Sequence, residues 1–272
     1  MQIYKTILLP VDGVDNSIEC LKIALELGDK FSSHIKGLRV VPTIESLQII
    51  GDYSYLSYEI YQQILDNQNQ ESENNKQAFH DIFNSSNLVY EWREEEGEFL
   101  KHLKLHARSA DLCIINQGDN SITDTMGTLS RFIIECGIPV LTMPKQRKFQ
   151  TMDNVIVAWD GSIESTRAIR AAIPLLKIAK NVTILSICEE KKDEILTAEI
   201  CKFLARHDVN VKGLTETLHF DIGAKIMETC LNLDADLIVS GAWAHSRIAE
   251  LIYGGVTKIL FNNQQIPVLF IH

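Results

Sequence analysis

The sequence predicts an α/β protein built from two tandem doubly wound parallel sheets, and two observations lead to this fold class. An apolar run that ends in Asp-Gly occurs at residues 7–13 and again at residues 155–161, 148 positions further on. Each half then alternates short apolar runs with helical apolar patterns, in the order βαβαβαβαβ. Because continuous apolar strands between helices are typical of a parallel sheet covered on both faces, we expect a five-stranded sheet of this kind in each half.

The first half contains the elements of one such sheet and a long insertion. Strands are expected at residues 7–11, 34–41, 111–115 and 137–141. A helical pattern of apolar residues follows the first strand, from Ile18 to Leu25. The insertion covers residues 42–84 and comprises a loop without a clear period and a polar helix over residues 59–84. The polar residues of this helix are expected to face water; a lid or a partner-binding surface is the alternative.

The second half repeats the same order without an insertion. Strands are expected near residues 154–159, 182–187, 210–217, 236–240 and 266–271, with helices at residues 163–179, 193–207, 222–233 and 255–263. Matching parts keep their order in both halves, so we interpret the chain as a duplication. The two domains are expected to cover residues 1–145 and 152–272, joined by a short basic linker.

Composition favours a cytoplasmic globular protein without a nucleic-acid or membrane partner. The 272 residues carry a formal net charge of -10, which would repel nucleic acid and anionic membranes. No apolar run approaches the roughly 20 residues of a spanning helix, and the first residues lack the apolar stretch of a signal peptide. The six cysteines form no Cys-x-x-Cys pair, so we expect buried, unreactive thiols.

The segment after the fourth strand of the second half is the clearest candidate for ligand binding. In a doubly wound sheet, ligands bind beyond the carboxyl ends of the strands. The chain here reads Ser240-Gly241-Ala242-Trp243-Ala244-His245-Ser246-Arg247 and then Tyr253-Gly254-Gly255-Val256-Thr257. Small residues before a helix let backbone N–H groups approach an anion, as in phosphate-binding loops. Ordinary turn glycines are the alternative interpretation.

This segment resembles the nucleotide loop of the universal stress protein family. Members that bind ATP have Gly, two residues, Gly, nine residues, and then Gly followed by Ser, Thr or Asn. Gly241, Ala244 and Gly254 take the three glycine places at the same spacing. Ala244 adds a methyl group near the phosphates, and Gly255 stands where the family has a side-chain donor. Thr257 or Ser246 is a candidate substitute for that donor.

The resemblance covers nearly the whole chain outside residues 42–84. It implies a Rossmann-like fold of the adenine nucleotide alpha hydrolase type, with an adenine-nucleotide site in the second half. Asp160 matches the family residue near the base and ribose, although an N-cap or Asx turn is also open to it. His245 and Arg247 are candidate phosphate partners or plain surface residues. The implied nucleotide-binding residues are Ala158, Asp160, Ile187, Ser240, Gly241, Ala242, Ala244, His245, Arg247, Gly254, Gly255 and Val256.

The first half is expected to hold a weaker second site. Its implied residues are Pro10, Asp12, Val41, Asn116, Gly127 and Thr128. Gly127-Thr128 matches the final pair of the family pattern, but only 11 positions separate Asn116 from Gly127, against 13 between Gly241 and Gly254. The shortened loop also carries two aspartates, which would repel phosphates.

No residue pattern is specific for a metal site. His102 and His106 lie four apart on a predicted helix, a spacing that can hold a metal, but no third ligand with suitable spacing is evident. Solvent-facing or partly buried histidines are therefore favoured. Glu94, Glu95 and Glu96 are interpreted as the solvated start of a helix.

The resemblance implies a stress-response protein that binds ATP or another adenine nucleotide, with Mg²⁺ as a candidate companion ion, and regulates through nucleotide occupancy. A partner-binding structural module with degenerate sites is the main alternative, favoured by Ala244 and Gly255. An enzyme is disfavoured because no nucleophile–base pair stands out, although slow ATP hydrolysis stays open. The last strands of the two halves are expected to pair in an intramolecular pseudo-dimer. A homodimer or an unknown protein partner is also open.

Overall fold

The computed structural model consists of two compact units, which we call the N-terminal unit (Tyr4–Ile138) and the C-terminal unit (Pro139–His272, with residues 1–3). It describes residues 3–11, 14–43, 58–117, 126–144, 151–188, 194–217, 221–242, 255–263 and 265–272. The units divide before the last strand of the first half. This division differs from the expected domain boundaries, because the strand Val140–Pro144 belongs to the C-terminal unit. The domains at residues 1–145 and 152–272 therefore stay a prediction.

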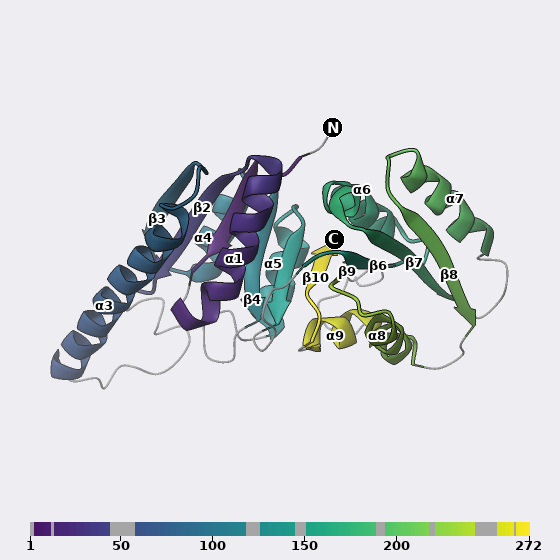
Figure 1. The fold of residues 1–272 in the computed structure, drawn as a ribbon. Coiled ribbons are helices and arrows are strands. Elements are labelled where there is room, and N and C mark those ends of the chain that lie inside the picture. The colour runs from purple at the N-terminus through teal and green to yellow at the C-terminus, as the bar shows by residue number, and fades with distance from the viewer. Residues whose placement is uncertain are drawn as a thin grey trace. The chain divides into compact units, whose positions relative to one another are not determined.

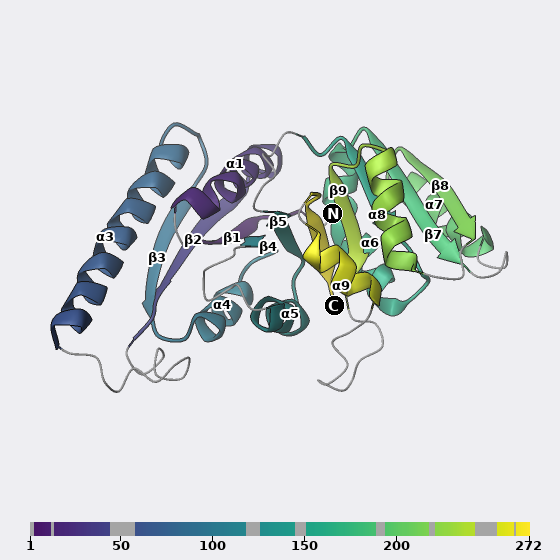
Figure 2. The same cartoon turned by 90° about the horizontal axis from the view of Figure 1, so that it is seen from below.

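The N-terminal unit is a parallel sheet with helices on both faces (Figure 1). Its strands are β1 (Thr6–Pro10), β2 (His34–Val41), β3 (Tyr90–Glu96) and β4 (Leu112–Gln117), and its helices are α1 (Val14–Phe31), α3 (Tyr58–Phe83), α4 (Phe99–Ala107) and α5 (Met126–Glu135). The strand order is β3-β2-β1-β4. Helices α1 and α3 pack together on one face, and α4 and α5 pack together on the other (Figure 2).

The C-terminal unit repeats this arrangement. Its strands are β5 (Val140–Pro144), β6 (Asn154–Ala158), β7 (Asn181–Cys188), β8 (Val211–Thr217), β9 (Leu237–Gly241) and β10 (Val268–Ile271), and its helices are α6 (Ile163–Ile178), α7 (Glu194–Ala205), α8 (Ile222–Asn232) and α9 (Gly255–Asn262). The order is β5-β10-β9-β6-β7-β8, in which β6 to β10 are parallel. All elements predicted for the second half are confirmed, with ends that differ by at most two residues.

Identical strand registers in the two units confirm the duplicated fold. Leu8 of β1 pairs with Cys113 of β4, and the residues that match them in the sequence, Ile156 of β6 and Ile238 of β9, also pair. The registers between the first and second strands agree in the same way, and so do those between the second and third strands. The two halves therefore match residue by residue across these sheets.

A matching aspartate fixes the fourth strand to the first strand in both units. Asp111 precedes β4, and its Oδ2 accepts the backbone N–H of Thr6 at 2.9 Å. Asp236 precedes β9, and its Oδ2 accepts the backbone N–H of Asn154 at 3.0 Å. Each carboxylate thus pairs with a backbone N–H at the start of the first strand of its unit.

Strand β5 confirms the predicted pairing between the last strands of the two halves. It runs antiparallel to β10, with Leu141 opposite Leu269 and Thr142 opposite Val268. The Thr142 hydroxyl also donates to the Val268 carbonyl at 3.1 Å. A strand from the first half of the sequence therefore covers an edge of the C-terminal sheet, where unpaired backbone groups would otherwise attract another strand.

Helix α3 corrects the interpretation of residues 42–84 as an insertion. It connects β2 to β3 as α7 connects β7 to β8, so it is an enlarged crossover helix of the fold. Most of its polar residues are partly or fully exposed, as predicted, but Ser72 and Asn75 are buried, contrary to the prediction, and Phe79 and Phe83 are fully buried. Phe79 contacts Trp92 of β3 with ring centroids 5.3 Å apart, and a Cβ on Gly37 of β2 would lie 2.8 Å from the Phe79 ring. The loop before α3, residues 44–57, lies outside the described residues.

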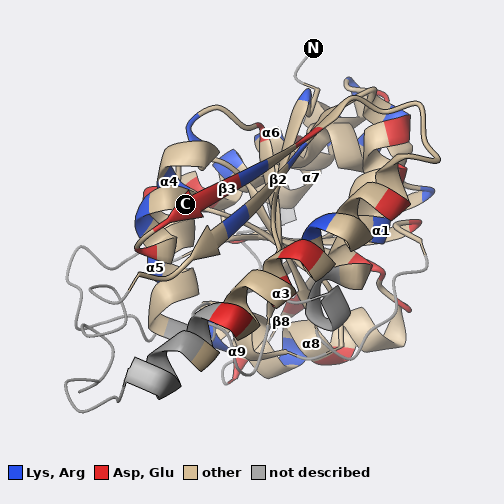
Figure 3. Ribbon diagram, turned by 90° about the vertical axis from the view of Figure 1, so that its left-hand side faces the viewer, with Lys and Arg blue, Asp and Glu red and all other residues tan. Residues whose placement is uncertain are grey.

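The acidic run Glu94–Glu96 is also placed differently from its prediction as a helix start. It forms the end of β3, paired with β2, and α4 begins only at Phe99 (Figure 3). Neighbouring side chains explain why a strand tolerates these charges. Ser72 of α3 donates to Glu94 at 2.6 Å, and Glu95 faces the histidines of α4.

Burial agrees with the expectation of unreactive thiols for the five cysteines whose side chains the structure describes. Cys20, Cys113, Cys136 and Cys230 are buried, and Cys201 is half-buried. Burial raises the pKa of Cys136 to about 11 and that of Cys230 to about 12, so neither forms much thiolate at neutral pH. Within the described residues, none of the helices combines the length and apolar character needed to cross a membrane.

Candidate functional site

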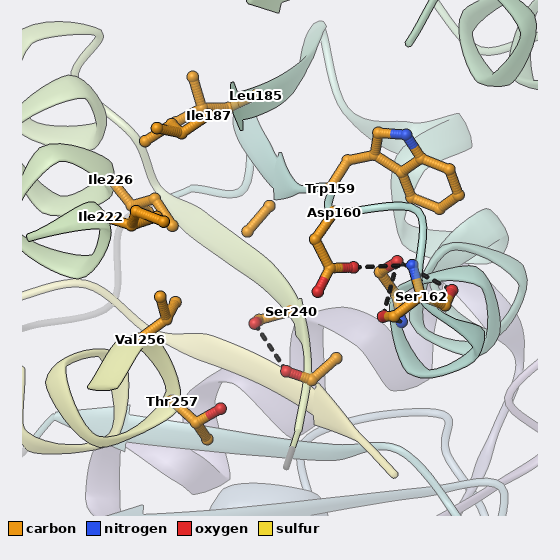
Figure 4. A pocket seen from close by; sticks show the side chains of 13 residues that line it. Trp159, Asp160, Ser162, Leu185, Ile187, Ile222, Ile226, Ser240, Val256 and Thr257 are labelled. Atoms are coloured by element: carbon orange, nitrogen blue, oxygen red, sulfur yellow. Dashed lines mark hydrogen bonds between the residues drawn. The ribbon is translucent and has the colours of Figure 1, made fainter. Parts of the chain in front are cut away.

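A pocket lies beyond the carboxyl ends of β6, β7 and β9 in the C-terminal unit, the place where doubly wound sheets bind ligands (Figure 4). Its volume is about 190 Å³. The first turns of α6, α8 and α9 complete its lining. Sequence-predicted residues that line it are Ala158, Asp160, Ile187, Ser240, Gly241 and Val256. Lining residues that the sequence did not single out include Ser162, Ser165, Leu185, Ile222 and Ile226.

Apolar side chains line one side of the pocket. Leu185 and Ile187 extend from β7, and Ile222 and Ile226 extend from α8 one helical turn apart (Figure 4). Such surfaces favour an apolar or aromatic group because its burial removes apolar area from water. The i,i+4 spacing of the two isoleucines marks one helix face in the sequence, but only the fold shows that this face meets β7.

Asp160 brings a carboxylate to the pocket from the turn between β6 and α6. Its Oδ1 accepts the backbone N–H of Ser162 at 2.9 Å, which confirms the Asx turn considered for it. Its second oxygen lies on the side of Ser240 (Figure 4). Burial raises the pKa of Asp160, but hydrogen bonds from Ser162 and Ser165 outweigh burial and hold the pKa below its ordinary value. The carboxylate is therefore an acceptor for ligand hydroxyl or amine groups.

The lowered pKa of Asp160 predicts a pH dependence for Asp160→Asn. The wild-type hydrogen bonds favour the ionised form, so their contribution to stability is present above the unfolded-state pKa of about 3.9. It is lost as the pH falls through the lower pKa of the folded protein. Denaturant unfolding should show wild type more stable than Asp160→Asn at pH 6 and the difference shrinking below about pH 4. A difference that grows on acidification would contradict this assignment.

The N-terminus of α6 is capped at the edge of the pocket. Ser162 is the N-cap, and its Oγ accepts the backbone N–H of Ser165 at 3.1 Å. The Ser165 hydroxyl donates in turn to the Ser162 carbonyl at 3.1 Å. This Ser-x-x-Ser pattern is a cap signal that could be recognised in the sequence. It fixes both hydroxyl groups on the pocket lining.

Gly241 has a packing role that the sequence interpretation missed. A Cβ at this position would lie 2.6 Å from the backbone N of Ser165 and 2.7 Å from the backbone carbon of Glu164. Real Cβ contacts are not this short, so the close approach of α6 to the end of β9 requires glycine here. We expected the glycine at this position to let the backbone approach a phosphate. In the structure it lets β9 approach the backbone of α6.

Several predicted residues lie elsewhere or outside the described part of the chain. Ala242 is fully buried next to the pocket, and its carbonyl lies 2.8 Å from Nδ1 of His272. Gly255 is the exposed first residue of α9. Thr257 lines the pocket from the same turn. Ala244, His245, Arg247 and Gly254 lie outside the described residues.

The predicted second site is spread over the equivalent edge of the N-terminal unit. Pro10 ends β1, Asn116 is near the end of β4, and Gly127 and Thr128 are in the first turn of α5. Asp12 lies outside the described residues. The strand registers correct one position.

Val40 is the residue that matches Ile187, because Leu38 pairs with Pro10 as Leu185 pairs with Ala158. Val41 is one residue further along β2. Successive side chains of a strand point to opposite faces, so a shift of one residue places Val41 on the wrong face for this role.

His102 and His106 lie on α4, as predicted, and both face Glu95. His106 Nε2 is 3.0 Å from one carboxylate oxygen, and His102 Nδ1 is 3.7 Å from the other. In the part of the chain that the structure describes, no group of three or more histidine, cysteine or acidic side chains is arranged to hold a metal ion.

Comparisons with known proteins agree with this architecture. No family model matches the sequence. A universal stress protein of Synechocystis sp. is 25% identical over 287 residues, which cover 97% of this chain and 99% of that relative. The structure of a universal stress protein from Archaeoglobus fulgidus matches with a TM-score of 0.76 at 15% identity, over 98% of this chain and 95% of that chain.

A further structural match shows that the fold alone does not select a function. The cytoplasmic domain of a prokaryotic cation chloride cotransporter matches with a TM-score of 0.56 at 12% identity, over 98% of this chain and 95% of that chain. Any likeness beyond the fold therefore rests on the Synechocystis relative, which matches in sequence. In sequence and in fold, over nearly its whole length, the chain matches universal stress proteins of the tandem two-domain type, and the resemblance seen in the sequence is confirmed.

Proposed function

We propose that the protein is a cytoplasmic stress-response protein that binds ATP or another adenine nucleotide in the pocket of its C-terminal unit. The observation that carries this proposal is the combination of an apolar slot with the Asp160 carboxylate at the carboxyl ends of β6 and β7. The apolar side chains would hold the base. Asp160 would accept hydrogen bonds from ribose hydroxyls or a base amine.

The size of the pocket fits part of a nucleotide. Its volume of about 190 Å³ is below the roughly 300–1,000 Å³ of pockets that enclose a drug-sized ligand. An adenosine moiety would therefore occupy it, with the phosphates toward the start of α9, where Val256 and Thr257 line the pocket. A helix start favours anions through its unpaired N–H groups and dipole. We propose Ala244, His245, Arg247 and Gly254 as further phosphate contacts, with Mg²⁺ as a companion ion.

The proposed role is binding and regulation, without a catalysed reaction. The pocket offers hydroxyl groups and one carboxylate that is hydrogen-bonded to a helix start, and an acceptor of this kind suits recognition. The alternative is a partner-binding module whose nucleotide sites are degenerate. The packing of Gly241 against α6 favours that alternative, because it supplies a reason for this glycine that involves no ligand.

Nucleotide retained by the purified protein tests the proposal. The protein is denatured, and any released nucleotide is identified by chromatography and mass spectrometry. We expect an adenine nucleotide. If none is released, titration calorimetry with ATP, ADP and AMP, each with and without Mg²⁺, should show binding. No heat of binding with millimolar nucleotide would reject the proposal and favour the partner-binding module.

A further inference from the structure

The third parallel strand of each unit, and the helix that follows it, can be aligned residue by residue between the two units from their contacts. In the N-terminal unit, Glu95 near the end of β3 faces His102 and His106, which lie one turn apart on α4. The strand registers place Glu216 of β8 at the position of Glu95. The residues that Glu216 contacts therefore give the helix alignment.

Glu216 makes the same two contacts with α8. Its carboxylate oxygens lie 3.1 Å from Nζ of Lys225 and 3.2 Å from the Thr229 hydroxyl, again one turn apart. Lys225 thus matches His102, and Thr229 matches His106. The same offset makes Phe99, the first residue of α4, the counterpart of Ile222, the first residue of α8.

Phe99 and Ile222 differ in size and in burial. Ile222 lines the pocket of the C-terminal unit and is partly exposed. Phe99 carries a larger side chain and is only 6% exposed. Helix α4 packs against α5, β1 and β2, and α8 packs against α9 and β7. At the position where Ile222 of α8 lines a pocket, α4 therefore carries a buried aromatic ring.

At two other equivalent positions, the N-terminal unit also has the larger side chain. Pro10 stands at the end of β1 where Ala158 ends β6. Asn116 of β4 takes the place of Gly241, because both lie four residues beyond matched leucines, Leu112 and Leu237, that pair with the first strand. Each change adds side-chain volume at the carboxyl ends of the N-terminal strands.

We propose that Phe99 fills, in the N-terminal unit, the space that the pocket occupies in the C-terminal unit. The residue at the start of the helix after the third parallel strand then determines which copy is open, and the chain binds a single nucleotide. This proposal rests on the proposed function for its ligand. Its packing claim holds independently, since the burial of Phe99 and the exposure of Ile222 do not depend on which molecule binds.

Exchange of the two residues tests the proposal by titration calorimetry with the full chain and ATP, ADP or AMP. Wild type should bind one equivalent. Ile222→Phe should weaken binding at least about tenfold, the equivalent of 1.4 kcal/mol, because the ring enters the apolar slot. Leu231→Phe, which adds the same ring at a 47% exposed position on α8, should bind as wild type does. Phe99→Ala should add a second, weaker equivalent.

Two equivalents in wild type, or undiminished binding by Ile222→Phe, would overturn the proposal. If Phe99→Ala does not fold, the comparison of Ile222→Phe with Leu231→Phe still decides it. If wild type binds no nucleotide, the proposed function fails, and thermal unfolding decides the packing claim. Phe99→Ala should then lower the melting temperature several degrees more than Ile222→Ala does, because it empties filled space. Equal shifts would refute the claim that Phe99 fills this space.

Discussion

Gly241→Ala is expected to destabilise the C-terminal unit and to weaken nucleotide binding. The added methyl group would lie 2.6 Å from the backbone N of Ser165 and 2.7 Å from the backbone carbon of Glu164, and backbone atoms cannot rotate away as a side chain can. Overpacking of this kind costs about 1–3 kcal/mol of unfolding free energy. Movement of the α6 start would also displace Ser162 and Asp160, so binding should weaken together with stability.

Gly255→Ala is the matched control for this prediction. A Cβ at Gly255 has no atom within 4 Å, and alanine favours the helix at this first position of α9. Denaturant unfolding should place Gly255→Ala within about 0.5 kcal/mol of wild type or slightly above it. Equal stability of the two alanine variants would show that α6 does not require glycine at position 241.

Phe79→Ala is expected to have the largest effect on stability, in the N-terminal unit. Phe79 is fully buried between α3 and the sheet, where it contacts Phe83, Tyr90 and Trp92. Removal of a buried phenylalanine ring costs about 3–5 kcal/mol because it combines lost burial with a cavity. Unfolding of the N-terminal unit can be followed by tryptophan fluorescence in a background that carries Trp159→Phe and Trp243→Phe, so that the signal comes from Trp92.

Ile82→Ala, at a partly exposed position of the same helix, controls for the change in helix propensity. It should lower the unfolding free energy by about 1 kcal/mol or less. If Phe79→Ala costs no more than Ile82→Ala, then α3 would be a loosely attached appendage, as the interpretation of residues 42–84 as an insertion implies. A large difference would establish α3 as a layer of the folded unit.

The strands and helices could be predicted because their signals are local. Apolar runs followed by helical periodicity specify a parallel sheet without knowledge of distant contacts, and the duplication repeats that signal. Glu94–Glu96 were misplaced because three charges suggest a solvated helix end. Their position in a strand depends on Ser72 and the α4 histidines, which the sequence does not place beside them.

The candidate site could be predicted only in part, for a related reason. Asp160 follows the end of β6 and Ile187 lies near the end of β7, so the rule for doubly wound sheets places them at the pocket. The walls from α8 and the requirement for glycine at position 241 arise from the packing of helices against strands, which has no local signature. Val41 was misassigned because a position on a strand must be correct to a single residue before its face is known.

Binding by two aspartate variants tests the central claim most directly. Asp160 and Asp12 occupy the same position in the two halves of the sequence, so Asp160→Ala and Asp12→Ala are matched substitutions. In titration calorimetry against the nucleotide that wild type binds, Asp160→Ala should weaken binding by about tenfold or more, as expected for a lost hydrogen bond to a charged group. Asp12→Ala should bind as wild type does. The reverse order would place the site in the N-terminal unit and contradict the account.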